Sequence, residues 1–234
     1  MILRLIRTIM SEGLTQDNVY YIISVLLSIP CLIFSLSFHE ASHAFMAHKL
    51  GDDTAKNFGR LTLNPLKHLD PIGPILLLFA GFGYAKPVPI NTRNFKNPKR
   101  GMALSAAAGP LSNLILAIVS ALLYILMTVV YVYTRGNTVA YIVSQMFYIM
   151  HYLNVALAVF NLIPINPLDG SRILQVFLPD RIYFKLMQYD RYFQMGLIVL
   201  LISGVLSTPI SVVTSAVSNV ILTPLSYLVG LIFR

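Results

Sequence analysis

The stretch from Gly101 to Tyr133 contains no Asp, Glu, Lys or Arg. An α-helix needs only about 20 apolar residues to cross the core of a bilayer, so this stretch is long enough to span one. Charged residues make up 11% of the chain and hydrophobic residues 56%, whereas soluble domains average about 25% charged residues. The sequence therefore predicts an all-α polytopic membrane protein.

Further apolar segments define the expected spans. We expect about five transmembrane helices, at Val19–Leu50, Met102–Thr134, Val139–Ile163, Phe193–Ser207 and Ile210–Phe233. The apolar run Pro71–Phe82 is bounded by prolines and glycines and is too short to cross as a helix. A short re-entrant or β-like membrane-inserted segment is expected there, covered by protein.

The basic residues indicate an orientation. With these spans, all of the 17 Lys and Arg residues except Arg4, Arg7 and Arg135 fall on one side, and the Lys- and Arg-rich side of a membrane protein is cytoplasmic. This predicts an N-terminus outside and a C-terminus inside. The net charge of +8 lies in short loops between apolar segments, a pattern that sets topology and argues against nucleic acid as a partner.

The second half of the first span carries the motif His39-Glu40-Ala41-Ser42-His43. Residues four apart on a helix project from one face, so the two imidazoles can share a zinc ion. Glu40 stands beside them, where it can take a proton from an activated water. Ionisable residues inside an apolar span are costly to bury, and their default explanation is functional.

A catalytic zinc ion needs a third protein ligand and an open position for water. Among the few acidic residues, Asp169 alone follows directly on an apolar span, between Pro167 and Gly170. The prolines break the helix and Gly170 permits a tight turn, so irregular backbone can present the carboxylate. A helix cap or turn aspartate at the membrane edge is the alternative interpretation.

Several motifs resemble those of the site-2 protease family of intramembrane zinc metalloproteases, in its compact form without a PDZ domain. The matching segments are Phe38–Ala44, Leu63–Pro65, His68–Pro71, Gly81–Pro89, Ala108–Asn113, Phe160–Pro164 and Pro167–Gly170. They cover roughly residues 30–175 and occur in the family's order. The chain has Asn166 where many relatives carry a proline.

The resemblance implies a role for each matching residue. His39, His43 and Asp169 would ligate one Zn²⁺ per chain, and Glu40 would activate the water. Asn113 would hold the substrate or the oxyanion, although an amide that bonds between helices is the alternative. The region containing Gly81 and Gly83 would form a membrane-inserted β element that binds an extended substrate by strand addition.

The substrate implied is a single-pass membrane protein or a signal peptide, cut in the cell membrane at a site toward the cytoplasm. Residues 1–18 are expected to form an amphipathic segment, 19–175 the catalytic core and 176–234 the C-terminal transmembrane helices. A zinc transporter and a catalytically silent scaffold are the alternatives. His48 is expected to face away from the site, and His151 is more simply a structural histidine than a ligand.

Overall fold

The structure is a computed structural model that describes residues 15–68 and 86–232. These residues form helices and connecting turns, without a strand. The longer helices are α2 (Gln16–Lys49), α5 (Pro98–Tyr133), α6 (Thr138–Asn161), α9 (Asp190–Ile202) and α10 (Ser207–Ile232). The short ones are α3 (Thr54–Asn57), η1 (Pro65–Lys67), η2 (Thr92–Asn94), α7 (Asp169–Leu174), η3 (Gln175–Phe177) and α8 (Asp180–Met187).

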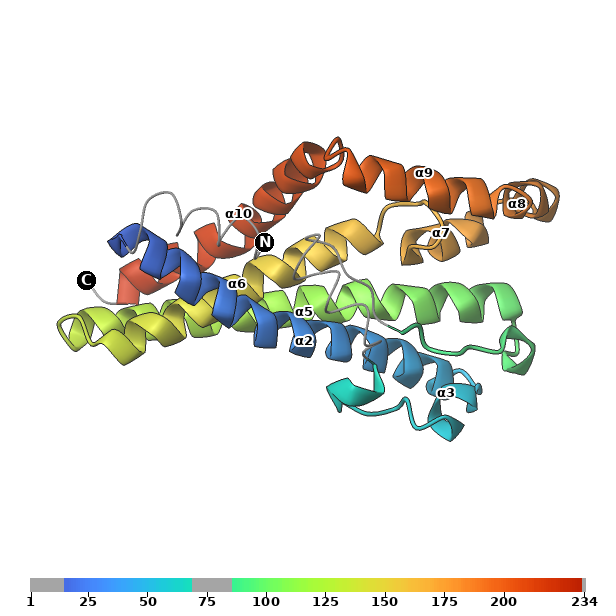
Figure 1. The fold of residues 1–234 in the computed structure, drawn as a ribbon. Coiled ribbons are helices and arrows are strands. Elements are labelled where there is room, and N and C mark those ends of the chain that lie inside the picture. The colour runs from blue at the N-terminus through green and yellow to red at the C-terminus, as the bar shows by residue number, and fades with distance from the viewer. Residues whose placement is uncertain (1–14, 69–85, 233–234) are drawn as a thin grey trace.

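Four helices in the described part of the chain are long and apolar enough to cross a membrane. They are Asn18–Lys49, Pro98–Tyr133, Thr138–Asn161 and Ser207–Gly230. Figure 1 shows α5 and α6 side by side and antiparallel, with α2 along them and α10 crossing behind. The predicted all-α polytopic membrane protein is confirmed at this level.

Side-chain caps begin the two central spans where the apolar runs begin. The side-chain oxygen of Asn97 accepts a hydrogen bond from the backbone N–H of Arg100, and Pro98 occupies the first turn of α5. Asn137 caps α6 in the same way, accepting from the backbone of Val139 and Ala140. These caps satisfy backbone N–H groups that have no partner within the helix.

Small residues let the spans approach one another closely. The buried face of α5 includes Ala103, Ala106, Gly109, Ala117 and Ala121, and four of these five are alanines. Lipid tails are as apolar as leucine, so helices in a bilayer associate through close packing rather than through exclusion of water. The small-residue face of α5 therefore lets α2 and α6, with their polar side chains, lie close to the α5 backbone.

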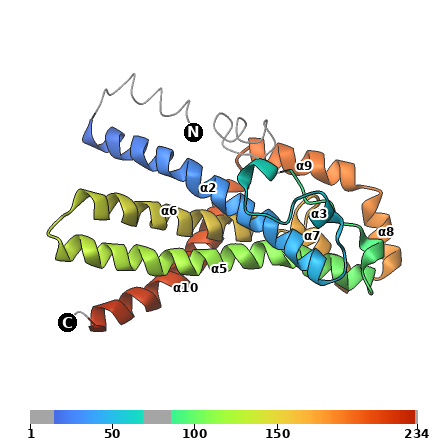
Figure 2. The ribbon, with the colours of Figure 1, turned by 90° about the horizontal axis from the view of Figure 1, so that it is seen from below.

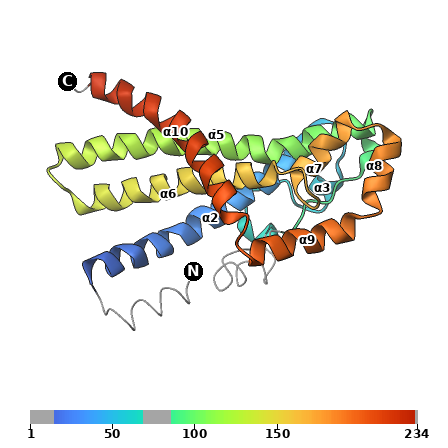
Figure 3. The same ribbon diagram turned by 90° about the horizontal axis from the view of Figure 1, so that it is seen from above.

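The fifth expected span, Phe193–Ser207, is not confirmed. It coincides with α9, a helix of 13 residues that is about 20 Å long at 1.5 Å per residue, followed by a bend at Gly204 in the left-handed region. Figures 2 and 3 show that α10 follows α9 and ends at the same end of the bundle as the first turn of α2 and the α5–α6 turn. With four crossings both described chain ends lie on one side, whereas we expected the C-terminus inside.

The opposite end of the bundle carries most of the short elements. The C-terminus of α2, the helices α3, α7 and α8, and the start of α5 all lie there (Figure 1). The expected re-entrant segment Pro71–Phe82 and most of the expected amphipathic segment 1–18 lie outside the described residues.

Candidate metal centre

His39 and His43 lie one turn apart on α2 and point their imidazoles toward one another. Their ring centroids are 4.5 Å apart and their planes are nearly perpendicular, and the two Nε2 atoms are 3.0 Å apart. Both residues are buried, with 4% and 6% of their surface exposed. The prediction that the motif places two imidazoles on one helix face is therefore confirmed.

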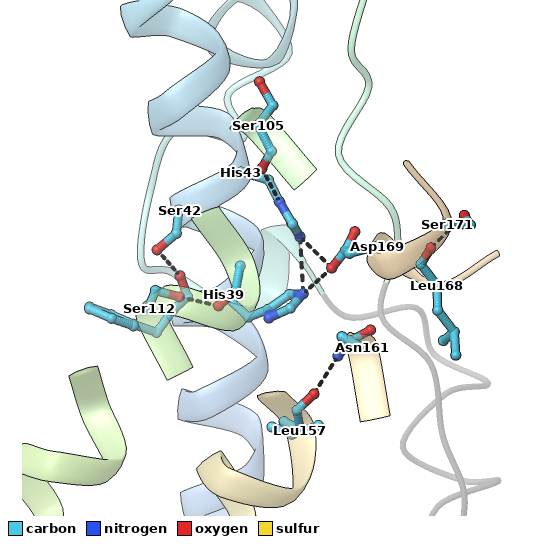
Figure 4. A network of polar contacts seen from close by, with 12 residues as sticks. His39, Ser42, His43, Ser105, Ser112, Leu157, Asn161, Leu168, Asp169 and Ser171 are labelled. Carbon is cyan, nitrogen blue, oxygen red and sulfur yellow. Dashed lines mark hydrogen bonds and ion pairs between the residues drawn. The ribbon is translucent and has the colours of Figure 1, made fainter. Parts of the chain in front are cut away.

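Asp169 reaches the histidines from the first position of α7 (Figure 4). Its Oδ2 atom lies 3.1 Å from Nε2 of His39 and 3.2 Å from Nε2 of His43. The connection from α6 to α7 is irregular, as predicted. Burial alone would raise the pKa of Asp169, but the two imidazoles beside its carboxylate outweigh burial and lower it. The carboxylate is thus an acceptor buried between two rings.

Gly170 acts through close approach rather than through a turn. A Cβ atom built on it would lie 2.3 Å from the carbonyl oxygen of Leu162 and 2.5 Å from that of Ile163. Its φ is not in the left-handed region. A side chain here would push the start of α7 away from the end of α6, and Asp169 with it.

The three converging atoms fit a metal ion. Ligand atoms placed tetrahedrally at about 2.0–2.1 Å from zinc lie about 3.3 Å from one another, close to the 3.0–3.2 Å found among these nitrogen and oxygen atoms. All three carry lone pairs, which repel at such distances unless a proton or a cation lies between them. Among the described residues, His39, His43 and Asp169 are the group of His, Cys, Asp and Glu that can hold a metal ion.

Two features of α5 that the sequence did not single out complete this geometry. Nδ1 of His43 lies 2.7 Å from the backbone carbonyl oxygen of Ser105. A carbonyl only accepts, so the proton is on Nδ1 and the Nε2 lone pair is free for a metal. Gly109, one turn further along, packs directly against both imidazoles. The motif Ala108–Asn113 had marked this helix without indicating either contact.

Glu40 is half-buried on the turn of α2 that carries His39. Its carboxylate makes no hydrogen bond or ion pair with a described residue, and it acts electrostatically on His43. Glu40 is not among the residues whose ligand atoms converge. It is therefore a carboxylate beside the candidate site rather than a fourth member of the cluster.

Asn113 is completely buried on α5, one helical turn beyond Gly109. Neither the Nδ2 nor the Oδ1 atom of its side chain has a hydrogen-bond partner among the described residues. The side-chain amide of Asn113 is thus unbonded within the described residues, one turn from the glycine that contacts both imidazoles.

Gly81 and Gly83 lie outside the described residues, but the chain that follows them is described. Residues 86–91 are irregular, and Pro87 and Pro89 lack backbone N–H groups. The backbone N–H of Lys86 donates to the carbonyl of His68 at 2.9 Å. Residues 86–89 therefore offer few free backbone N–H groups with which an added substrate strand could pair.

The remaining histidines have partners away from the cluster. His48 contacts the carboxylate of Asp53 at the surface, in agreement with its expected position on the far side of α2. His68 is fully buried, with Nε2 2.7 Å from the carbonyl oxygen of Thr62. Neither joins the candidate metal centre.

His151 is a structural histidine, as the simpler interpretation held. It is fully buried in α6, with Nδ1 2.9 Å from the carbonyl oxygen of Ala117 in α5 and Nε2 2.8 Å from the hydroxyl of Ser218 in α10. Both ring nitrogens are used, so the ring links three spans and has no lone pair left for a metal.

Comparison with known proteins identifies the family. Residues 27–206 match the model of peptidase family M50. The chain is 47% identical over 173 residues to the provisionally named zinc metalloprotease YwhC of Bacillus subtilis (strain 168), covering 73% of this chain and 76% of that protein. It is 29% identical over 180 residues to the provisionally named zinc metalloprotease Rip2 of Mycolicibacterium smegmatis (strain ATCC 700084 / mc(2)155), covering 75% of this chain and 66% of that protein. No solved structure matches the chain significantly. The chain belongs to peptidase family M50, the family of the site-2 proteases, and is an intramembrane zinc metalloprotease.

Proposed function

We propose that His39, His43 and Asp169 hold the zinc ion and that Glu40 is the general base for hydrolysis of a peptide bond. The observation that carries this proposal is the convergence of two imidazole nitrogens and one carboxylate oxygen within 3.2 Å of one another. The two histidines on α2 and the aspartate on α7 are 126 or more residues apart in sequence and are buried where a membrane protein otherwise avoids charge.

A zinc ion held by these atoms would supply the Lewis acid that makes water a nucleophile near neutral pH and polarises the peptide carbonyl. The chain's own residues orient and move the proton. Glu40 takes a proton as the water oxygen bonds to the carbonyl carbon, and returns it to the amide nitrogen as the C–N bond breaks. The products are a carboxylic acid, which transfers its proton to the amine on ionising, and an amine, and Glu40 is again a carboxylate.

Asn113 is proposed to hold the substrate carbonyl or the oxyanion that forms on it. Support comes from its free, fully buried amide one turn from Gly109, the residue in contact with both imidazoles. Replacing Asn113 with alanine should lower kcat by about 10²-fold while zinc content and thermal stability stay unchanged. A structural amide would lose stability instead.

Gly81 and Gly83 are proposed to belong to a re-entrant element that receives an extended substrate. Support comes from the flanks of residues 69–85, because His68 and Lys86 are joined by a backbone hydrogen bond. The described residues that flank this segment therefore lie together, as a re-entrant element requires and a single crossing does not allow. A helical peptide bond is shielded by its own turn, so a site that extends the substrate is needed.

The metal-site end of the bundle is proposed to face the cytoplasm of the cell membrane, with four crossings. Support comes from charge, because every described Lys and Arg except Arg135 lies at that end. The proposed substrate is a single-pass membrane protein or a signal peptide. No described feature favours zinc transport or a silent scaffold, since all four residues of the site are retained.

Exchange of Glu40 for glutamine tests the proposal. The variant should bind zinc with wild-type stoichiometry and cleave about 10²–10⁴-fold more slowly, because general-base assistance is lost while the ligands stay. Zinc content is measured by metal analysis, and cleavage is measured by the accumulation of membrane stubs in cells. Cleavage at the wild-type rate would contradict the mechanism.

A further inference from the structure

The helix α10 meets the rest of the bundle through two hydroxyl groups. Within residues 207–230, the buried positions are Thr214 and Ser218, with 1% and 5% of their surface exposed. They are four residues apart and so share one face of the helix. Apolar neighbours such as Val212 and Val220 are exposed, as lipid-facing side chains are. Polar side chains that bond across helices hold spans together in a bilayer, so the partners of these two hydroxyls determine how α10 docks.

Ser218 has its partner in His151 on α6, whose Nε2 atom lies 2.8 Å from the hydroxyl. The two helices run in opposite directions, since α6 leads toward the metal-binding end of the bundle and α10 leads away from it (Figure 3). Three residues further along α6 is Asn154, and four residues back along α10 is Thr214. Each is about 5 Å nearer the metal-binding end than the His151–Ser218 pair. Asn154 and Thr214 therefore lie at one level of the bundle.

At that level, two buried oxygen atoms lack a hydrogen-bond partner among the described residues. They are Oδ1 of Asn154 and Oγ1 of Thr214. The amide nitrogen of Asn154 donates to the hydroxyl of Ser35 on α2 at 2.8 Å and to the carbonyl of Met150 at 2.7 Å. Both amide hydrogens are thus used, and the amide cannot turn round without losing these bonds. The oxygen keeps its orientation, and a buried oxygen without a partner is costly.

A water molecule has the hydrogen-bonding groups to satisfy both oxygens. The Asn154 oxygen only accepts hydrogen bonds, whereas the Thr214 hydroxyl both donates and accepts. Water can donate to the first and pair either way with the second, and buried water in proteins takes two to four such partners. No acidic residue occurs in α6 or α10, so the site does not suit a cation.

We propose that Asn154 and Thr214 bind a buried water molecule between α6 and α10. Asn154 is also bonded to α2, and His151 is also bonded to α5 through the carbonyl of Ala117. The water and the His151–Ser218 bond together therefore join α10 to all three of the other spans. The site rests on the packing of the spans and is independent of the catalytic roles proposed above.

Solid-state NMR on the full-length, zinc-loaded protein in lipid bilayers tests the site directly. Asparagine, threonine and alanine are labelled with ¹³C and ¹⁵N, and the transfer of magnetisation from water to each side chain is followed in time. Transfer to Thr214 and Asn154 should build up faster than transfer to the methyl group of Ala121, which is fully buried in α5. This arm needs no substitution, so it does not depend on the folding of a variant.

Replacing Thr214 with valine keeps the shape of the side chain and removes the hydroxyl. Loss of its bond to the water should lower the midpoint of thermal denaturation by about 2–4 °C, the shift expected for one hydrogen bond in a chain of this size. Thr128→Val is the matched control, because the Thr128 hydroxyl donates to the carbonyl of Tyr124 in its own helix at 2.8 Å. Its midpoint should stay within about 1 °C of the wild type.

Other arrangements of the two oxygens give different results. A dry layer would leave transfer at the rate seen for Ala121, and Thr214→Val would keep or raise the midpoint, since valine removes a buried group that has no partner. A direct bond between Thr214 and Asn154 would lower the midpoint in Thr214→Val without fast transfer from water. Either result overturns the inference, as does an equal loss of stability in the two valine variants.

Discussion

Replacing Gly109 with alanine adds one methyl group at the point where α5 touches the candidate metal centre. The new Cβ would lie 2.4 Å from Nε2 of His43, 2.5 Å from Cε1 of the same ring and 2.5 Å from Cε1 of His39. Ordinary contacts between such atoms are about 3.5 Å, so the rings or the helix must move by about 1 Å. Metal–ligand distances tolerate only about 0.2 Å.

Two opposing terms govern the stability of this variant. Overpacking a close contact costs about 1–3 kcal/mol, whereas alanine in place of glycine within a helix gains about 1 kcal/mol. The net loss of stability should therefore be at most about 2 kcal/mol. A displacement of 1 Å at a reacting centre lowers the rate about 10²-fold, so zinc affinity and kcat should fall far more than stability.

The assay measures zinc affinity by competition with a chelator, together with kcat and the midpoint of thermal denaturation. Gly196→Ala is the matched control, because a Cβ at that position of α9 meets nothing within 4 Å. Wild-type zinc affinity and kcat in Gly109→Ala would refute the close packing of α5 against the two imidazoles.

Three further predictions follow from the same contacts. Asp169→Ala should lower both zinc content and activity because two imidazoles alone leave the ion under-coordinated, and full zinc occupancy would assign the carboxylate to the turn alone. His151→Leu should lower the midpoint of thermal denaturation, at about 1 kcal/mol for each interhelical hydrogen bond lost, with zinc content unchanged; loss of zinc would identify a ligand instead. Cysteines introduced at Asn137 and Tyr227 (with Cys31 replaced) should be labelled from the same side of the membrane, whereas five crossings would place them on opposite sides.

Local patterns determined much of this protein. The uncharged run from Gly101 to Tyr133 predicts a spanning helix because length and apolarity are enough for a segment to cross a bilayer. His39 and His43 share a face because the geometry of one helix relates residues four apart. Asp169 could be singled out because prolines, a glycine and the end of a span adjoin it. None of these inferences requires information on which helices are in contact.

Contacts between elements were decided only by the tertiary structure. The carbonyl of Ser105 and the bare backbone of Gly109 meet the imidazoles because α5 packs closely on α2, and a sequence pattern carries no distance between two helices. The number of crossings does not follow from the sequence for a related reason. By hydropathy, α9 and α10 are two apolar segments. Whether they cross the membrane twice or once depends on the direction that the chain takes after the bend at Gly204. The packing of α10 against α5 and α6 sets that direction.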